Sequence, residues 1–163
     1  MTIQEEKDFI LSVQVKNHAG VLQRISGLFS RRCYNIKSIV AAQTVTPELT
    51  EILIVVTGDD RVVSQVKKQV EKLVDVVRVT VLDQQTCIAR EHMLIAVNRT
   101  METRNRLLGI AQVFHAEVLY VKEDTVLFEV VGTPATLDSF VRLFAPEEVK
   151  KILRTGTMAI QLD

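Results

Sequence analysis

The stretch KNHAGVLQRISGLFSRRCYNI, residues 16–36, places a short polar turn directly before a segment with helical periodicity. The apolar residues recur three and four positions apart, at Val21, Leu22, Ile25, Leu28 and Phe29. This spacing predicts an amphipathic helix over residues 20–32. The stretch holds no catalytic arrangement of side chains, so it indicates binding rather than chemistry.

The residues on either side of this helix complete a βαββαβ order. Alternating and β-branched residues predict a strand before the helix, and Pro47 breaks the following apolar segment into a hairpin. A second amphipathic helix begins after Asp59 or Asp60, either of which can cap it. The predicted strands cover residues 8–16, 35–45, 49–58 and 75–82, and the second helix covers residues 59–74.

The same order of elements returns after a polar segment, residues 83–91, which is predicted to be a short linker. The second half is predicted to contain a strand at 92–98, a helix at 103–114, a hairpin at 116–132 that turns at Glu123-Asp124, a helix at 134–145 and a strand at 149–162. The sequence therefore predicts an α+β fold of two ferredoxin-like βαββαβ units, residues 1–83 and 84–163.

Composition and charge exclude several classes of protein. The 20 basic and 20 acidic residues cancel, so no overall field attracts phosphates, and a nucleic-acid partner is disfavoured. The longest apolar run, residues 52–56, is far too short to cross a membrane. Cys33 and Cys87 are isolated thiols and the first residues lack the features of a targeting peptide, so a soluble cytoplasmic protein is expected.

The apolar run at residues 52–56 has a structural consequence. Both faces of this strand are apolar, whereas a βαββαβ unit supplies helices for only one face of its sheet. Exposing the other face would forgo roughly 1.5–3 kcal/mol per side chain. A second sheet, from another subunit or from the other half of the chain, is therefore expected to cover it, with scattered surface valines as the alternative.

The start of the first helix is the candidate binding site. The backbone amides of Gly20, Val21 and Leu22 lack intrahelical acceptors, and the helix dipole adds partial positive charge, so a carboxylate is stabilised there. Asn17 offers a donor and an acceptor beside them. The alternatives are ordinary: Asn17 could simply cap the helix, and Asn35 could end it in left-handed geometry.

Other kinds of site find no support in the sequence. His18, His92 and His115 lack companions at metal-ligand spacing, so no metal site is expected. Phosphate-loop, dinucleotide and nucleophile motifs are absent, and no catalytic residue is assigned. RNA-recognition modules share the βαββαβ order, but their central strands carry aromatic residues for base stacking, which residues 10–16 and 51–58 do not supply.

Five segments resemble, in order, the small regulatory subunits of acetohydroxyacid synthase, also called acetolactate synthase. The first contains the opening stretch and resembles an ACT domain. The segments are LSVQVKNHAGVLQRISGLFSRRCYNIKSI (11–39), KLVDVVRV (72–79), AREHMLIAV (89–97), VVGTPATLDSFVRLF (130–144) and ILRTGTMAI (152–160).

This resemblance implies a noncatalytic protein that binds the catalytic large subunit of branched-chain amino acid biosynthesis, raises its activity and confers feedback inhibition by valine or a related amino acid. Thiamine diphosphate, FAD and Mg²⁺ would belong to that partner, and this chain would hold no cofactor. The effector would lie between two copies of the chain. One copy would supply Asn17, Gly20, Val21 and Leu22, and the other copy Asn35 and Ile36.

Three features depart from the family pattern. Cys33 stands where a glycine is usual, Lys37 stands where an acidic residue is usual, and TVTPELTEIL (44–53) differs from the usual acidic-Pro and Ser-Arg-Met stretch. Because of these departures, the resemblance supports sensitivity to the effector less firmly than it supports membership of the family. A free-standing amino-acid sensor that controls another protein is the alternative.

Overall fold

The computed structural model describes residues 7–83 and 85–162. The helices of these residues are α1 (Val21–Arg31), α2 (Asp60–Val70), α3 (Arg104–Phe114) and α4 (Pro134–Val141), with a 3-10 turn η1 (Pro146–Glu148). The strands are β1 (Lys7–Lys16), β2 (Ile36–Gln43), β3 (Leu49–Gly58), β4 (Val76–Val81), β5 (Cys87–Asn98), β6 (Glu117–Val121), β7 (Thr125–Gly132), β8 (Val149–Arg154) and β9 (Met158–Gln161).

The chain forms two compact units. The first extends to Ile88 and includes the segment from Thr157 onward, and the second is Ala89–Gly156. The predicted boundary between residues 83 and 84 falls on residue 84, which is outside the described residues.

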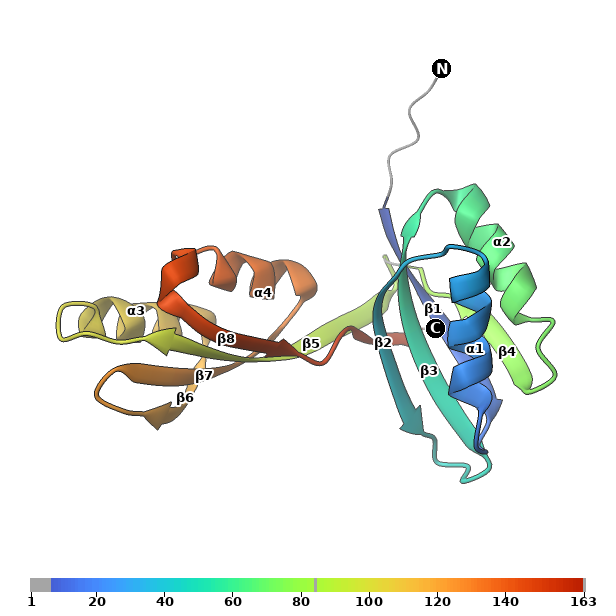
Figure 1. Cartoon of the computed structure of the whole chain (residues 1–163), viewed down its shortest axis with the longest axis horizontal. Coiled ribbons are helices and arrows are strands. Elements are labelled where there is room, and N and C mark those ends of the chain that lie inside the picture. The colour runs from blue at the N-terminus through green and yellow to red at the C-terminus, as the bar shows by residue number, and fades with distance from the viewer. Residues whose placement is uncertain (1–6, 84, 163) are drawn as a thin grey trace, which may run out of the picture. The chain divides into compact units, whose positions relative to one another are not determined.

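The first unit is a four-stranded antiparallel sheet in the order β2-β3-β1-β4, with α1 and α2 packed on one face (Figure 1). Alternate residues of each strand point to that face because side chains in a strand alternate between its two sides. Ile52, Ile54 and Val56 of β3 are buried there with Ile25 and Phe29 of α1. Asp59 caps α2, its carboxylate accepting a hydrogen bond from the Val62 amide at 2.7 Å.

The second unit repeats this topology, with its strands in the order β6-β7-β5-β8. Strand β9, which belongs to the first unit, pairs with β5, whose first two residues also belong to that unit. Its core centres on Phe140 of α4, which is fully buried. The Phe140 ring meets those of Phe114, Phe128 and Phe144 at centroid distances of 5.2, 5.9 and 5.3 Å. The predicted α+β fold of two βαββαβ units is confirmed.

Three local predictions are wrong. The polar segment at 83–91 is not wholly a linker, because β5 begins at Cys87. The helices end earlier than their apolar residues suggested, α2 at Val70 and α4 at Val141. The predicted final strand is two strands, β8 and β9, separated at Gly156, whose φ of 87° lies in the left-handed region that strand residues do not adopt.

The C-terminal segment lies over the open face of the first sheet. The Thr157 amide donates to Ser38 Oγ of β2 at 3.4 Å, and the Leu162 amide donates to the Thr86 carbonyl at 2.9 Å. Leu82 and Val55, which point away from the helices, are only 6% and 4% exposed. Part of the face that the sequence expected a second sheet to cover is thus covered by a single returning strand, β9.

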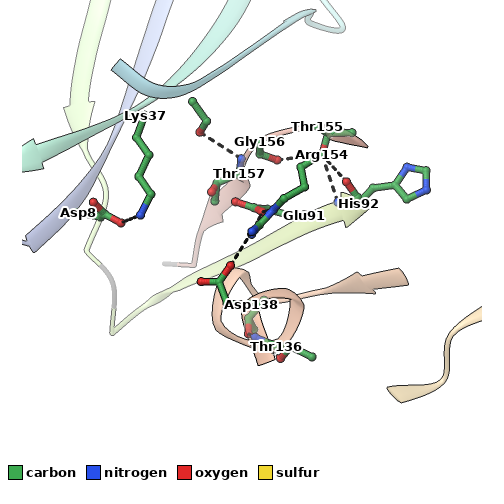
Figure 2. A network of polar contacts seen from close by, with 12 residues as sticks. Asp8, Lys37, Glu91, His92, Thr136, Asp138, Arg154, Thr155, Gly156 and Thr157 are labelled. Atoms are coloured by element: carbon green, nitrogen blue, oxygen red, sulfur yellow. Dashed lines mark hydrogen bonds and ion pairs between the residues drawn. The ribbon is translucent and has the colours of Figure 1, made fainter. Parts of the chain in front are cut away.

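Ion pairs stabilise the second unit at the end of β8. Arg154 donates from Nε to Glu91 Oε2 at 2.8 Å and from Nη1 to Asp138 Oδ1 of α4 at 2.6 Å (Figure 2). Burial lowers the pKa of Arg154, but these hydrogen bonds raise it more, so its pKa lies above the ordinary value. Since Glu91 is buried, Arg154 supplies the charge that its carboxylate needs there.

Candidate functional site

The turn between β1 and α1 presents uncapped backbone amides. Gly20 occupies the N-cap position with φ 88° and ψ −9°, a left-handed conformation that glycine adopts without steric cost. The first helical hydrogen bond runs from the Arg24 amide to the Gly20 carbonyl at 3.1 Å, so the amides of Val21 and Leu22 precede it. Within the described residues no side chain caps this end, and the first turn carries no acidic residue.

A Cβ on Gly20 would meet no atom within 4 Å. The backbone at Gly20 is therefore open to an approaching ligand. The same observation means that a side chain placed here is limited by its φ angle and not by a clash with the rest of the chain.

Asn17 does not cap the helix, so the capping interpretation of this residue is wrong. Its Nδ2 donates to the Pro47 carbonyl at 2.9 Å, and its backbone amide donates to the Glu48 carbonyl at 2.7 Å. Asn17 thus ties the end of β1 to the β2–β3 connection. Its side-chain oxygen accepts no hydrogen bond from the described residues, and Asn17 as a whole is exposed.

An ionic cluster that the sequence did not reveal fixes this turn. Asp75, only 6% exposed, accepts a hydrogen bond from Arg24 of α1 and lies 2.8 Å from His18 Nε2. Burial raises the pKa of Asp75, but the hydrogen bonds with His18 and Arg24 lower it more, so the carboxyl group has a pKa below its ordinary value. In the sequence, Arg24 is 51 positions from Asp75 and His18 is 57 positions from it, so no local pattern indicated the cluster.

Val21 and Leu22 differ in what they can offer a ligand. The Val21 side chain is 5% exposed and belongs to the core, so only its amide is available. The Leu22 side chain is 48% exposed beside the uncapped amides. It gives the site an apolar wall.

Asn35 and Ile36 lie at the other end of α1. A helix of 11 residues is roughly 16 Å long at 1.5 Å per residue, so α1 separates these residues from the Gly20 turn. Asn35 is exposed, and Ile36 begins β2, which forms one edge of the sheet. A single chain therefore does not bring the two predicted groups of site residues together.

The left-handed residue at this end of α1 is Cys33 with φ 56°, so the alternative that Asn35 ends the helix in that geometry is wrong. The Tyr34 amide donates to the Phe29 carbonyl at 3.0 Å and the Cys33 amide to the Ser30 carbonyl at 3.1 Å. This is the Schellman pattern, and the Phe29 and Tyr34 rings pack edge to face at 6.1 Å, the apolar contact that accompanies it. Cys33 holds the position that usually belongs to glycine.

Lys37, the other unusual residue, forms an ion pair with Asp8 of β1 (Figure 2). Burial raises the pKa of Asp8, whereas hydrogen bonds from Lys37 and Thr57 lower it by more, so its pKa is below the ordinary value. The charge of Lys37 is therefore paired within the first unit.

Comparison with known proteins places this geometry in a family. Residues 11–78 match the family described as AHAS small subunit-like ACT domain, and residues 90–163 match the small subunit of acetolactate synthase. The Bacillus subtilis acetolactate synthase small subunit is 38% identical over 92% of this chain and 88% of its own length. The chain belongs to the acetolactate synthase small subunit family.

Other members of this family agree over the same span. The probable acetolactate synthase small subunit of Methanothermobacter thermautotrophicus is 34% identical over 98% of this chain and 96% of its own. The crystal structure of the acetolactate synthase small subunit from Thermotoga maritima superposes with a TM-score of 0.88 at 32% identity, covering 96% of this chain and 98% of that one. The resemblance stated from the five sequence segments is confirmed across both units.

His92 and His115, like His18 beside Asp75, occupy positions that a structural role explains. His92 Nε2 lies 2.7 Å from Glu129 Oε1, and His115 ends α3 in a left-handed conformation with φ 52°. In the described part of the chain, no three His, Cys, Asp or Glu side chains are grouped so that they could hold a metal ion.

Over those same residues, none of the helices has the length and apolar character needed to span a membrane.

Proposed function

We propose that this chain is an effector-binding regulatory subunit. It binds valine or a related branched-chain amino acid at the start of α1, activates the catalytic large subunit of acetolactate synthase, and confers feedback inhibition on it. The active site, with its thiamine diphosphate, FAD and Mg²⁺, belongs to that partner. Membership of the small-subunit family supports the proposal that the partner is the large subunit. The proposed location, in keeping with this role, is the cytoplasm.

The single observation that carries the effector site is the uncapped N-terminus of α1. A carboxylate on the amides of Val21 and Leu22 replaces the missing cap and meets the positive end of the helix dipole. The free side-chain oxygen of Asn17 can accept a hydrogen bond from an ammonium group. The exposed Leu22 side chain then lies beside the aliphatic part of the ligand.

The site is completed by a second copy of the chain in this proposal. Asn35 and Ile36 are too far from the Gly20 turn to contact the same small ligand within one chain, because the length of α1 separates them. The edge strand β2, which begins at Ile36, has no partner on its outer side among the described strands. Pairing two such edges in a homodimer would bring Asn35 of one copy toward the turn of the other.

The energetics favour recognition of the class of ligand over the individual amino acid. Charge-assisted hydrogen bonds contribute about 1.5–3 kcal/mol each, whereas one methylene contributes about 0.8 kcal/mol. Valine, leucine and isoleucine should therefore differ modestly in affinity. Control of the partner needs a coupling free energy of about 1–3 kcal/mol between the effector and the catalytic subunit.

A matched pair of substitutions at Gly20 tests the site. Gly20→Asp places a carboxylate beside the amides and repels the effector, whereas Gly20→Asn has nearly the same size, tolerates the same φ angle and is neutral. We expect Gly20→Asp to abolish valine binding measured by calorimetry. It should also abolish inhibition of the complex by valine, while the variant still activates the catalytic subunit. Gly20→Asn should bind valine more tightly than Gly20→Asp does.

Asn35→His tests the contribution of the second copy, and it should weaken valine binding without altering activation. Inhibition of both Gly20→Asp and Asn35→His at the wild-type valine concentration would refute the site. Sedimentation of the wild-type chain as a monomer in saturating valine would refute the shared pocket.

A further inference from the structure

The second unit contains a small apolar cavity of about 160 Å³ between α3 and the β6–β7 hairpin. Its floor is buried core, since Leu107, Val126 and Phe128 are at most 6% exposed. Its walls open to solvent, with Leu108 47% and Val121 52% exposed. Apolar side chains that line a cavity and remain exposed forgo burial, which a bound apolar group would restore.

Two arginines give the cavity a positive mouth. Arg99 and Arg104 line it, and neither guanidinium forms an ion pair with any described residue. Arg99 is held in place because its Nη1 donates to the Lys122 carbonyl at 3.0 Å. Arg104 has no hydrogen-bond partner within the described part of the chain, so its donors are free for a ligand.

Two carboxylates near these arginines are paired with other basic groups. Asp124, which follows β6, pairs with Lys150 at 2.6 Å, and hydrogen bonds from Lys150 and Thr125 keep its pKa below the ordinary value. Glu148 pairs with Arg106. An anion at the cavity mouth would therefore meet two guanidinium groups whose charge is not already neutralised by these carboxylates.

We infer that this cavity binds a small carboxylate with a branched or cyclic apolar tail. An apolar cavity of about 150 Å³ is large enough for a benzene-sized molecule, so the tail has about four to six carbons. The tail lies against Leu107, Val126 and Phe128, and the carboxylate bonds to Arg104 with Arg99 beside it. The ammonium of an α-amino acid would be repelled by both arginines, so this site selects a carboxylate that lacks one.

This site is separate from the proposed effector site. None of its residues belongs to the turn at Gly20, and it lies wholly within the second unit. It does occupy the corresponding place in the repeated topology, since Arg99 follows β5 as Asn17 follows β1. The two sites differ in ligand, because the second offers guanidinium groups where the first offers backbone amides and an asparagine oxygen.

The test is a titration of the full-length chain with 3-methylbutanoate, observed through leucine and valine methyl resonances in NMR. We expect millimolar binding, in keeping with so small a ligand, with shifts concentrated on Leu107, Leu108, Val118, Val121 and Val126. The uncharged isostere 3-methylbutanamide should bind about tenfold more weakly. Shifts scattered over other methyl groups would overturn the assignment.

Four variants locate the binding. Arg104→Gln should lower the affinity for 3-methylbutanoate about tenfold. The control Arg142→Gln, in the same unit but outside the cavity, should leave that affinity unchanged. Val118→Phe should fill the cavity and abolish binding, with the rest of the methyl spectrum showing that the unit is folded. Gly20→Asp should bind 3-methylbutanoate normally, which separates this result from the outcome of the valine experiment. Equal affinity in Arg104→Gln and wild type, or equal affinity for valine and 3-methylbutanoate at these methyls, would overturn the inference.

Discussion

Replacing Cys33 by glycine should stabilise this protein. Cys33 holds φ 56° at the end of α1, where a residue with a Cβ pays about 1–2 kcal/mol relative to glycine. Glycine also gains conformational freedom in the unfolded chain, which offsets about 0.5–1 kcal/mol of that difference. The Cys33 side chain is exposed, so the substitution removes no buried contact. The net gain expected in the free energy of unfolding is about 0.5–1 kcal/mol.

The measurement is thermal unfolding by calorimetry in the presence of a reducing agent. For a chain of this size a gain of 1 kcal/mol raises the melting temperature by about 2–4 °C, so an increase of about 1–4 °C is expected. Cys33→Ala is the matched control, because it removes the thiol while keeping the Cβ, and it should melt close to wild type. The hydrogen bonds from Tyr34 and Cys33 that end the helix are made by the backbone and remain in both variants.

If the glycine variant melts no higher than the alanine variant, the left-handed conformation is not a source of strain and the reasoning fails. The result also bears on the effector site. Asn35 follows this turn by two residues, and Cys33→Gly keeps the same backbone path, so valine affinity should be unchanged.

Two further predictions concern the ionic and aromatic clusters. Because the pKa of Asp75 is lowered on folding, its stabilising effect is present above its unfolded pKa of about 3.9 and is lost as the pH falls through the folded value. Acid titrations followed by circular dichroism should show a smaller loss of stability below pH of about 4 for Asp75→Asn than for wild type; equal losses would contradict the ion pairs. Phe140→Ala should destabilise the second unit by about 3–5 kcal/mol in urea, and Phe140→Leu by clearly less, since Phe140 contacts three other rings. A cost for Phe140→Ala below about 1 kcal/mol would show that the core collapses around the gap.

The elements themselves could be predicted from local patterns. Residues 52–56 are apolar throughout and form the middle of β3, and the helical spacing of Val21, Ile25, Leu28 and Phe29 places these residues on the buried face of α1. Asp59 was one of two candidate caps, and it is the one that bonds to the Val62 amide. Such features depend on residues within one turn or one strand, which is the range over which sequence patterns are informative.

Features that depend on distant residues escaped prediction. Helix capping was one alternative for Asn17, but its side chain donates to the Pro47 carbonyl, 30 positions away. Asp75 gave no signal, because its partners His18 and Arg24 lie in the other half of the unit. The break between β8 and β9 coincides with Gly156, yet a glycine by itself does not predict that a strand ends there and that the residues after it belong to the first unit.

The sequence by itself determined the two βαββαβ units, the family, and the polar turn with a glycine at the start of α1, because periodicity and local residue types settle these. Only the tertiary structure decided which groups hold the Gly20 turn, which residue takes the left-handed position after α1, and what covers the open face of the first sheet. The physical reason is that hydrogen bonds, ion pairs and burial act between atoms close in space, and folding brings together residues that no local pattern connects.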